Sequence, residues 1–470
     1  MQAVNPPPDG GYPGGNTAEG QSALLSLTTG TYNTGVGIFA LLSDTEGKFN
    51  TALGAATLLG NTGDQNTATG AGALLSNTTG SGNIADGAFA LFSNIDGSEN
   101  SALGLNALTS NTSGFGNTAV GANALRNNTE GGTNTATGVQ ALFTNTTGQD
   151  NTASGYQALF FNDGDPTNNQ GTANSAFGAY ALGSNTTGAL NSAFGWSALG
   201  FNTTGSINTA LGDVALLNNI DGNDNVAIGD SALYHNSSGG ANVAVGGSAL
   251  FANTTGTGNT AVGAGALGSL NSGIYNTAVG YSSGSGVTTA NDVISIGSGG
   301  DNVDNSCFIG NIYSNIQPVN GTDPDYVTIA SNGRLGRSNF NGSSRRFKHD
   351  IKPMDETSEV IFALKPVSFR YNQEYDASQR ISFGLIAEEV AEVAPDLVGR
   401  NRKGQPESVR YEQVNAMLLN EFLKEHKKVE KLEAALDAVN KRLRKQDEKI
   451  EKVNARVELN VSARRKVANK

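Results

Sequence analysis

Small apolar and polar residues alternate along most of the chain with one fixed period. A glycine ends each N-T-A-x-G unit from Gly37 to Gly297, and thirteen of the fifteen spacings between these glycines are 17 residues. The full unit reads roughly N-T-A-V-G-x-x-A-L-x-x-N-T-T-G-x-x. A period this regular is typical of a solenoid with one coil per repeat, not of an ordinary globular core. The pattern predicts a mainly β fold, with a β-roll or β-helix-like repeat rod over residues 31–297.

Two sets of positions alternate before each glycine. Ala stands two residues before it in fourteen of the sixteen units, whereas the residue directly before it is often larger and apolar, as in Leu53, Val120 and Phe177. Successive side chains of a strand point to opposite faces. If one set fills the coil, the other needs a cover, and we expect three chains side by side to provide it.

Asn and Gly recur where each coil must turn. Both residue types tolerate positive φ, so the Asn-Thr-Thr-Gly segments are expected to form the corners, with the N-T-A-x-G and A-L segments as strands or extended turns. Turn chemistry also explains the regular Asn-x-Thr triplets better than glycosylation does. One spacing of 23 residues predicts a six-residue surface insertion near residues 162–170.

Composition changes abruptly near residue 343. Residues 1–342 carry a net charge of −17, whereas residues 343–470 carry a net charge of +5. An acidic rod argues against nucleic acid as a partner, because phosphate binding requires a positive field. No run of 18 apolar residues is present, so no membrane span is expected, and the first residues lack the pattern of a signal peptide.

The sequence gives no sign of a metal or cofactor site. The Asp residues of the repeat are scattered and do not follow the fixed ligand spacing of calcium-binding coils, so no metal and no cofactor is expected. Cys307 is the one cysteine, which excludes a disulfide within the chain. We expect Cys307 to be a small buried apolar residue beside Phe308 and Ile309.

The regions outside the repeat follow in order. Residues 1–30 are Pro/Gly-rich and predicted to be flexible, and residues 298–342 are predicted to form a β neck with strands near 306–312 and 326–330. A helix is expected to open at Tyr411 and to continue as a coiled coil over residues 417–460, with a basic tail at 461–470. Its apolar seam has 3-4 spacing, with Gln446 as one polar member that fixes register or strand number: Val429, Leu432, Leu436, Val439, Leu443, Gln446, Ile450, Val453 and Val457.

A serine and a lysine stand five residues apart where the composition changes. They are Ser343 and Lys348 in the run Asn341-Gly342-Ser343-Ser344-Arg345-Arg346-Phe347-Lys348. A serine hydroxyl needs a base to act as a nucleophile, and a lysine is a base only when desolvation makes it neutral. From spacing alone, a plain domain boundary remains the simpler interpretation.

The sequence after this point resembles the C-terminal intramolecular chaperone domain of phage tailspikes and endosialidases. The segments that carry the resemblance are Ile351-Lys352-Pro353, Leu364-Lys365-Pro366-Val367-Ser368-Phe369-Arg370-Tyr371, Phe383-Gly384-Leu385-Ile386-Ala387-Glu388-Glu389-Val390 and Ala394-Pro395-Asp396-Leu397-Val398. The resemblance implies a small α+β domain over residues 343–416 that trimerises and then cuts itself from the upstream fibre.

The resemblance also implies roles for residues at the junction. Ser343 takes the place of the nucleophile, Lys348 that of the general base, and Gly342–Ser343 that of the scissile bond. The position after the nucleophile is often Asp in this family and is Ser344 here, which bears on the rate of cleavage. Glu388 and Glu389 are expected on a helix surface or at a trimer contact, with no catalytic role.

The repeat in turn resembles the head repeats of trimeric autotransporter adhesins. Together the two resemblances imply a homotrimeric, adhesin-like fibre located outside the cell, at a cell surface or on a virion, with a single-turnover autocatalytic serine peptidase at its C-terminal end. The alternative is an uncleaved structural fibre whose C-terminal domain only trimerises. The ligand of the rod, a host surface or a glycan, is left open by the sequence.

Overall fold

The computed structural model describes residues 12–310, 327–329, 335–337, 345, 348–373, 378–401 and 403–468. The chain divides into two compact units, residues 1–318 and 319–470. Each unit has its own core, one built from the repeat and one from the segments after residue 350.

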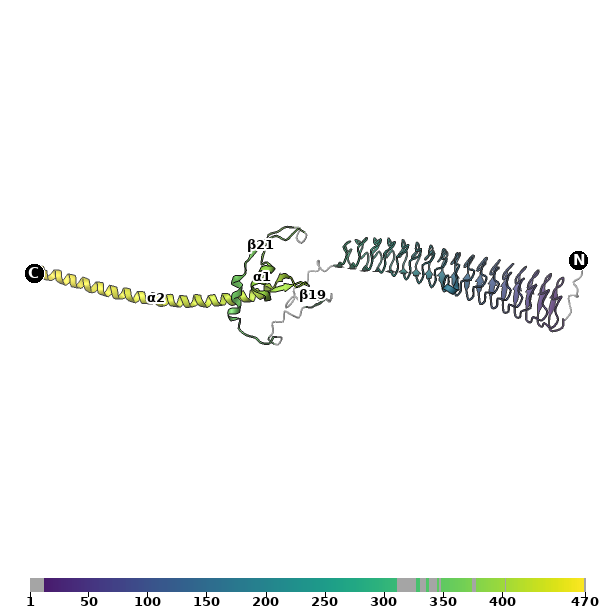
Figure 1. The fold of residues 1–470 in the computed structure, drawn as a ribbon, viewed down its shortest axis with the longest axis horizontal. Helices are drawn as coiled ribbons and strands as arrows, with labels where there is room; N and C mark the ends of the chain where they lie inside the picture. Colours follow the sequence, from purple (N-terminus) through teal and green to yellow (C-terminus); the bar gives the residue numbers. More distant parts are fainter. Residues whose placement is uncertain are drawn as a thin grey trace. The chain divides into compact units, whose positions relative to one another are not determined.

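The first unit is a solenoid whose three-residue strands lie side by side, one per coil (Figure 1). Each strand pairs with the next in parallel and in register; at the first pair, for example, Ala18 lies opposite Gly35. Their bounds are β1 Thr17–Glu19, β2 Thr34–Val36, β3 Thr51–Leu53, β4 Thr67–Thr69, β5 Ile84–Asp86, β6 Ser101–Leu103, β7 Thr118–Val120, β8 Thr135–Thr137, β9 Thr152–Ser154, β10 Ser175–Phe177, β11 Ser192–Phe194, β12 Thr209–Leu211, β13 Val226–Ile228, β14 Val243–Val245, β15 Thr260–Val262, β16 Thr277–Val279, β17 Ile294–Ile296 and β18 Cys307–Ile309. The coils thus begin before residue 31 and continue beyond residue 297.

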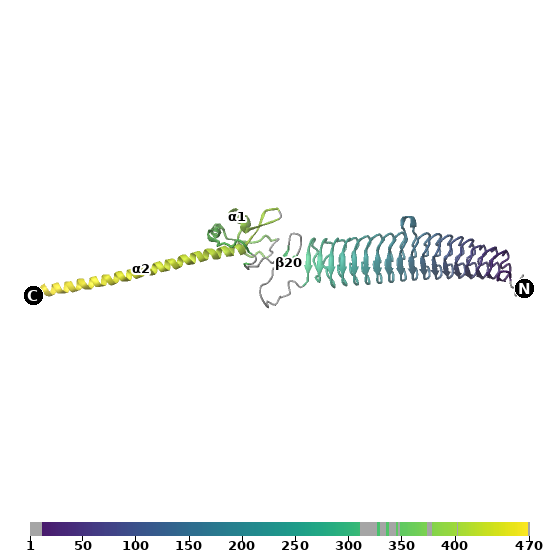
Figure 2. The same cartoon turned by 90° about the horizontal axis from the view of Figure 1, so that it is seen from below.

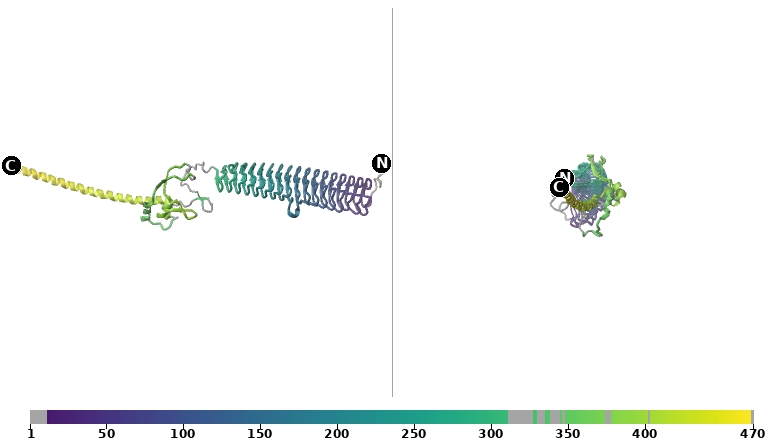
Figure 3. Two further views of the ribbon diagram at one scale, coloured as in Figure 1. Left: turned by 45° about the horizontal axis from the view of Figure 1, so that its top comes forward. Right: turned by 90° about the vertical axis from the view of Figure 1, so that its left-hand side faces the viewer.

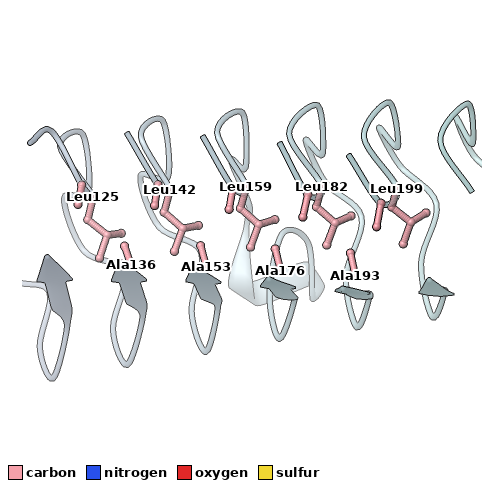
Figure 4. Close-up of a cluster of buried hydrophobic side chains, with 14 of the residues drawn as sticks. Leu125, Ala136, Leu142, Ala153, Leu159, Ala176, Leu182, Ala193 and Leu199 are labelled. Carbon is pink, nitrogen blue, oxygen red and sulfur yellow. The ribbon is translucent and has the colours of Figure 1, made fainter. Parts of the chain in front are cut away.

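The core of the solenoid is a column of alanines and leucines. The middle residue of each strand points inward, and a leucine from the opposite side of the coil faces it, as with Ala136 and Leu125 in Figure 4. Both of these side chains are fully buried. The larger residue that ends each strand points outward instead; Leu103 and Phe177, for example, are 40% and 39% exposed. The alanine set therefore fills the coil. The outward set forms an apolar row on the strand face from β10 to β18, whereas β1, β4, β5, β8 and β9 carry polar residues at this position.

Two rows of buried asparagines run along the solenoid beside this column. One row stands four residues before each glycine, and the other seven residues after it. Asn100 shows the pattern of the first row: its Nδ2 donates to the carbonyl of Gly114 at 2.8 Å, and its Oδ1 accepts the backbone N–H of Asn117 at 3.0 Å. In the second row, Asn94 Nδ2 donates to Asn77 Oδ1 at 2.7 Å and to the carbonyl of Gly97 at 2.8 Å. These asparagines link successive coils, whereas the sequence had placed them only at corners.

Positive φ occurs at glycines and also at leucines of the core. At Gly104, with φ of +138°, an added Cβ would lie 2.7 Å from the carbonyl of Gly121 in the next coil, so no side chain fits there. Leu108 and its equivalents have φ near +50°. A left-handed conformation costs about 1–2 kcal/mol for an L-residue. Full burial of a leucine returns roughly 1.5–3 kcal/mol, which offsets that strain.

The expected insertion is confirmed as a surface loop. It contains the short 3-10 helix η1 (Pro166–Asn168) and projects from the solenoid (Figures 2 and 3). The Asp165 carboxylate caps this turn by accepting the backbone N–H of Thr167 at 2.9 Å. The loop leaves the coils on either side in register, since β9 pairs directly with β10.

The C-terminal end of the solenoid is closed by side chains. Asn302 Oδ1 accepts the backbone N–H groups of Thr288, Thr289 and Ala290 at 2.8–2.9 Å, where a further coil would otherwise supply carbonyls. Cys307 is exposed, so the expectation that it is buried is wrong. In β18 the inward position belongs to Phe308, which packs against the core, and Cys307 points the other way.

The second unit combines small hairpins with helices. Antiparallel pairs form between β19 (Val327–Ile329) and β20 (Leu335–Arg337), β21 (Val367–Phe369) and β22 (Ser382–Gly384), and β23 (Val398–Arg400) and β24 (Pro406–Val409). The helical elements are the 3-10 helices η4 (Asp355–Ala363) and η5 (Pro395–Leu397) and the α-helices α1 (Ala387–Val393) and α2 (Tyr411–Ala468). Val390, Leu397, Val398 and Val414 form its core, which joins α1 and β23 to the start of α2.

Helix α2 extends far beyond this core as a single helix (Figure 1). It covers the whole region in which a coiled coil was expected. The apolar members of the predicted seam are between 48% and 68% exposed: Val429, Leu432, Leu436, Val439, Leu443, Ile450, Val453 and Val457. In the part of the chain that the structure describes, no helix has the length and apolar character needed to cross a membrane.

Candidate functional site

Of the predicted catalytic pair, only Lys348 lies within the described residues. Ser343 and the Gly342–Ser343 bond fall outside them, so the distance between the two catalytic groups stays a prediction. Lys348 lies in an irregular segment before η4, where its backbone N–H donates to the carbonyl of Arg345 at 3.1 Å. Its side chain is exposed in the single chain.

The residues after Lys348 are also open to solvent. His349 Nδ1 lies 3.0 Å from Asp350 Oδ2, and these two side chains are 95% and 86% exposed. A lysine acts as a base at neutral pH only if burial disfavours its charged form. Within the described segment 348–350, the exposed side chains of His349 and Asp350 do not supply such burial.

A polar cluster joins η4 to α2; Ser358 and Glu421 are buried in it, and Asn420 and Lys424 are half-buried. The Ser358 hydroxyl is fully buried and donates to Glu421 Oε1 at 2.5 Å, and Asn420 Nδ2 donates to Ser358 Oγ at 2.7 Å. Lys424 Nζ lies 2.7 Å from Glu421 Oε1 and 3.3 Å from Glu359 Oε1. Every member of the cluster thus has a partner across the two elements.

Hydrogen bonds in this cluster shift the ionisation of two groups. The hydrogen bond from Lys424, followed by that from Ser358, holds the pKa of Glu421 below its ordinary value. The same bond raises the pKa of Lys424. Both groups therefore remain charged over the neutral range, which keeps η4 fixed on α2. Sequence reasoning missed this cluster, because Ser358 and Glu421 are 63 residues apart and neither belongs to a recognisable motif.

The Phe383-Gly384-Leu385 segment, one of the motifs singled out in the sequence, fixes the hairpin to α2. Tyr411 Oη accepts the backbone N–H of Leu385 at 2.9 Å. A Cβ added at Gly384 would lie 2.7 Å from the same Oη, so a larger residue there would require the Tyr411 side chain to shift. Glu388 and Glu389 are exposed in the first turn of α1, which agrees with their expected place on a helix surface.

Large apolar side chains lie on the surface of the second unit. Phe383 is 82% exposed, Phe362 69% and Phe422 67%, and Leu418 and Leu419 are more than half exposed. The seam of α2 adds further exposed apolar side chains, and such residues mark interaction sites when they gather on one surface. Within the described ranges, no group of three or more His, Cys, Asp and Glu side chains is placed to hold a metal ion.

Comparison with known families identifies this part of the chain. Residues 343–399 match the model of a peptidase family described as the chaperone of endosialidase. The match begins at the predicted nucleophile and ends within β23, and it confirms the resemblance to the C-terminal intramolecular chaperone domain. No curated protein and no solved structure matches the chain.

Proposed function

We propose that the chain, whose residues 343–399 form a chaperone-of-endosialidase domain, is the subunit of a homotrimeric fibre that assembles through this domain and then releases it by self-cleavage. The family match carries the proposal. The apolar surface of the second unit supports it, because Phe362, Phe383 and Phe422 need cover that one chain does not supply.

Trimer contacts are proposed in both units. In α2, the exposed heptad seam suits a coiled coil with two other copies. In the solenoid, the apolar row on the strand face runs almost without interruption from Phe177 to Ile309, as Phe177, Phe194, Leu211, Ile228, Val245, Val262, Val279, Ile296 and Ile309. Phe177 and Phe194 stack with ring centroids 4.8 Å apart and stay partly exposed. Three copies that pack along this face would bury the row.

The proposed cleavage uses Ser343 and Lys348. Neutral Lys348 accepts the hydroxyl proton while Ser343 Oγ attacks the carbonyl carbon of Gly342. The Lys348 ammonium then returns this proton to the leaving nitrogen as the Gly342–Ser343 amide bond breaks, which frees the α-amine of Ser343 and leaves an ester between Gly342 and Oγ. Water then hydrolyses this ester, which separates residues 1–342 from a fragment that begins at Ser343.

Assembly is proposed to precede cleavage. Lys348 is exposed among the residues that the structure describes, and packing of neighbouring copies against its segment would supply the burial that makes it a base. This order would let the fibre fold before its chaperone leaves. The activity is a single turnover on the chain itself, with no external substrate. A fibre of this kind belongs outside the cell, at a cell surface or on a virion.

The cleavage proposal is tested with paired variants. Ser343→Ala and Lys348→Ala are expected to give one uncut chain on a denaturing gel. Ser344→Ala and Lys352→Ala are matched controls, since each removes the same side chain nearby. Both should still be cut, Ser344→Ala at a changed rate because position 344 bears on the rate of cleavage. Cleavage that persists in Ser343→Ala and Lys348→Ala would exclude this pair as the catalytic groups.

A further inference from the structure

One row on the outer surface of the solenoid loses its large side chains at two neighbouring coils, and again near its C-terminal end at Gly268 and Ser285. The fifth residue after each repeat glycine is usually large, and successive side chains stack: Phe143 on Phe160 at 5.1 Å between ring centroids, and Tyr234 on Phe251 at 5.3 Å. In the next two coils after that of Phe160, this position is occupied by Gly183 and Gly200 instead. Two consecutive side chains are therefore missing from the row.

The missing side chains leave a hollow of about 460 Å³. This volume lies within the range of about 300–1,000 Å³ that small-molecule sites occupy. Trp196, Phe161 and Phe201 are each more than half exposed at its edge. The complete lining is Gln157, Phe160, Phe161, Tyr180, Gly183, Ser184, Trp196, Ser197, Gly200, Phe201 and Leu217.

The repeat departs from its pattern in three ways at this one place. Gly183 and Gly200 replace large residues. Trp196 is the single tryptophan of the chain. The inserted loop begins directly after Asn162, the residue that follows Phe161. Elsewhere the coils repeat with almost constant length. Gly268 and Ser285 also interrupt the row, but neither the tryptophan nor the insertion accompanies them. The coincidence of all three departures at the same coils indicates a local function, because coil stacking alone requires none of them.

None of the residues in the apolar row of the strand face lines the hollow. Leu182 and Leu199 face the strands across the core in Figure 4, and Gly183 and Gly200 follow them directly in sequence. The apolar row proposed as a chain–chain contact lies on the strand face. The hollow thus remains accessible in the proposed trimer, and the inference depends on residues of the solenoid alone.

We propose that this hollow binds a neutral saccharide. Aromatic faces are apolar and flat, so they suit the C–H face of a pyranose ring, while Gln157, Ser184 and Ser197 offer hydrogen bonds to hydroxyl groups at its edge. No charged side chain lines the hollow, and residues 1–342 carry a net charge of −17. An anionic sugar would be repelled by this field, which favours neutral glycans.

The single tryptophan makes the site directly observable in the full-length protein. The probes are neutral oligosaccharides (maltoheptaose, cellohexaose and N-acetylchitohexaose), with an oligogalacturonate as the anionic comparison. We expect saturable quenching or a blue shift of Trp196 fluorescence with at least one neutral probe and none with the oligogalacturonate. Gly183→Leu fills the hollow and is expected to weaken binding by at least about tenfold.

Gly268→Leu is the matched control. Gly268 also stands five residues after its repeat glycine, and its added Cβ would meet a carbonyl at 3.1 Å, as at Gly183. This variant should bind like the parent protein. The proposal is overturned if no neutral probe binds saturably, or if Gly183→Leu binds as well as Gly268→Leu. A fluorescence change that follows protein concentration, and not saccharide, would assign the hollow to a second copy of the chain and also overturn it.

Discussion

Truncation of one buried asparagine, Asn117→Ala, tests how the coils are held together. Asn117 Oδ1 accepts the backbone N–H of Asn134 at 3.0 Å, and its Nδ2 donates to Asn100 Oδ1 at 3.1 Å and to the carbonyl of Gly131 at 2.8 Å. After truncation, Gly131 still accepts from Asn128, and Asn100 Oδ1 still accepts the backbone N–H of residue 117. Asn134 Nδ2 loses its bond to Asn117 Oδ1 at 3.1 Å but still donates to the carbonyl of Gly148 at 2.8 Å. The backbone N–H of Asn134 is therefore the one donor left without a partner.

The expected cost follows from that one unpaired donor and the space left by the amide. A buried N–H without a partner costs about 1–3 kcal/mol, and the small cavity adds to it, for a total of about 3 kcal/mol. In a solenoid this loss is local, because each coil contacts only its neighbours. Local opening should then become about 150-fold more frequent around residues 130–137.

Hydrogen exchange followed by mass spectrometry measures this opening peptide by peptide. Asn127→Ala is the matched control, since Asn127 is only half buried and should cost less than about 0.5 kcal/mol. Equal protection of residues 130–137 in the two variants would refute the view that the buried asparagines hold the coils together.

Three further changes probe the two units. Asp44 occupies an asparagine position in the buried row, and burial raises the pKa of its carboxyl. The stability of the solenoid should therefore fall as pH rises through that raised pKa. Asp44→Asn should raise the melting temperature at pH 7, and this gain should shrink below about pH 4. A gain independent of pH would contradict this reasoning. Gly104→Ala should cost about 3 kcal/mol or more in denaturant unfolding, because its Cβ would meet the Gly121 carbonyl, whereas Gly268→Ala should cost little. Ser358→Ala should lower the denaturation midpoint more than Thr357→Ala does, because it removes the hydrogen bond to Glu421. This difference should shrink as pH falls through the lowered pKa of Glu421. Equal midpoints would argue that the polar cluster does not stabilise the second unit.

The period of the repeat made the solenoid predictable from sequence, because each coil uses the same few residue types at the same places. Alternation before the glycine also predicted two opposite faces, and the structure assigns alanine to the inside. The asparagines were harder to place, since a residue that favours turns is here fully buried and bonded along the axis. Leucines with positive φ, such as Leu108, run against local preference and follow only from packing.

The C-terminal domain was predictable through its motifs, and less so through its contacts. Gly384 belongs to a motif that the sequence revealed. The small residue at this position is explained by the nearby Tyr411 hydroxyl, which is a tertiary contact that no sequence pattern predicts. The Ser358–Glu421 hydrogen bond joins residues that no spacing connects. Ser343 and Lys348 rest on the family pattern, and their pairing stays a prediction. The aromatic hollow arises where Gly183 and Gly200 replace large residues, and a consensus repeat averages such single departures away.

The mass of the mature wild-type protein tests the central proposal most directly. Denaturing mass spectrometry should find two products, residues 1–342 and residues 343–470, the second beginning at Ser343, and native mass spectrometry should find the larger product as a trimer. A single chain of 470 residues, or a monomeric larger product, would contradict an assembly that folds as a trimer and then releases its chaperone.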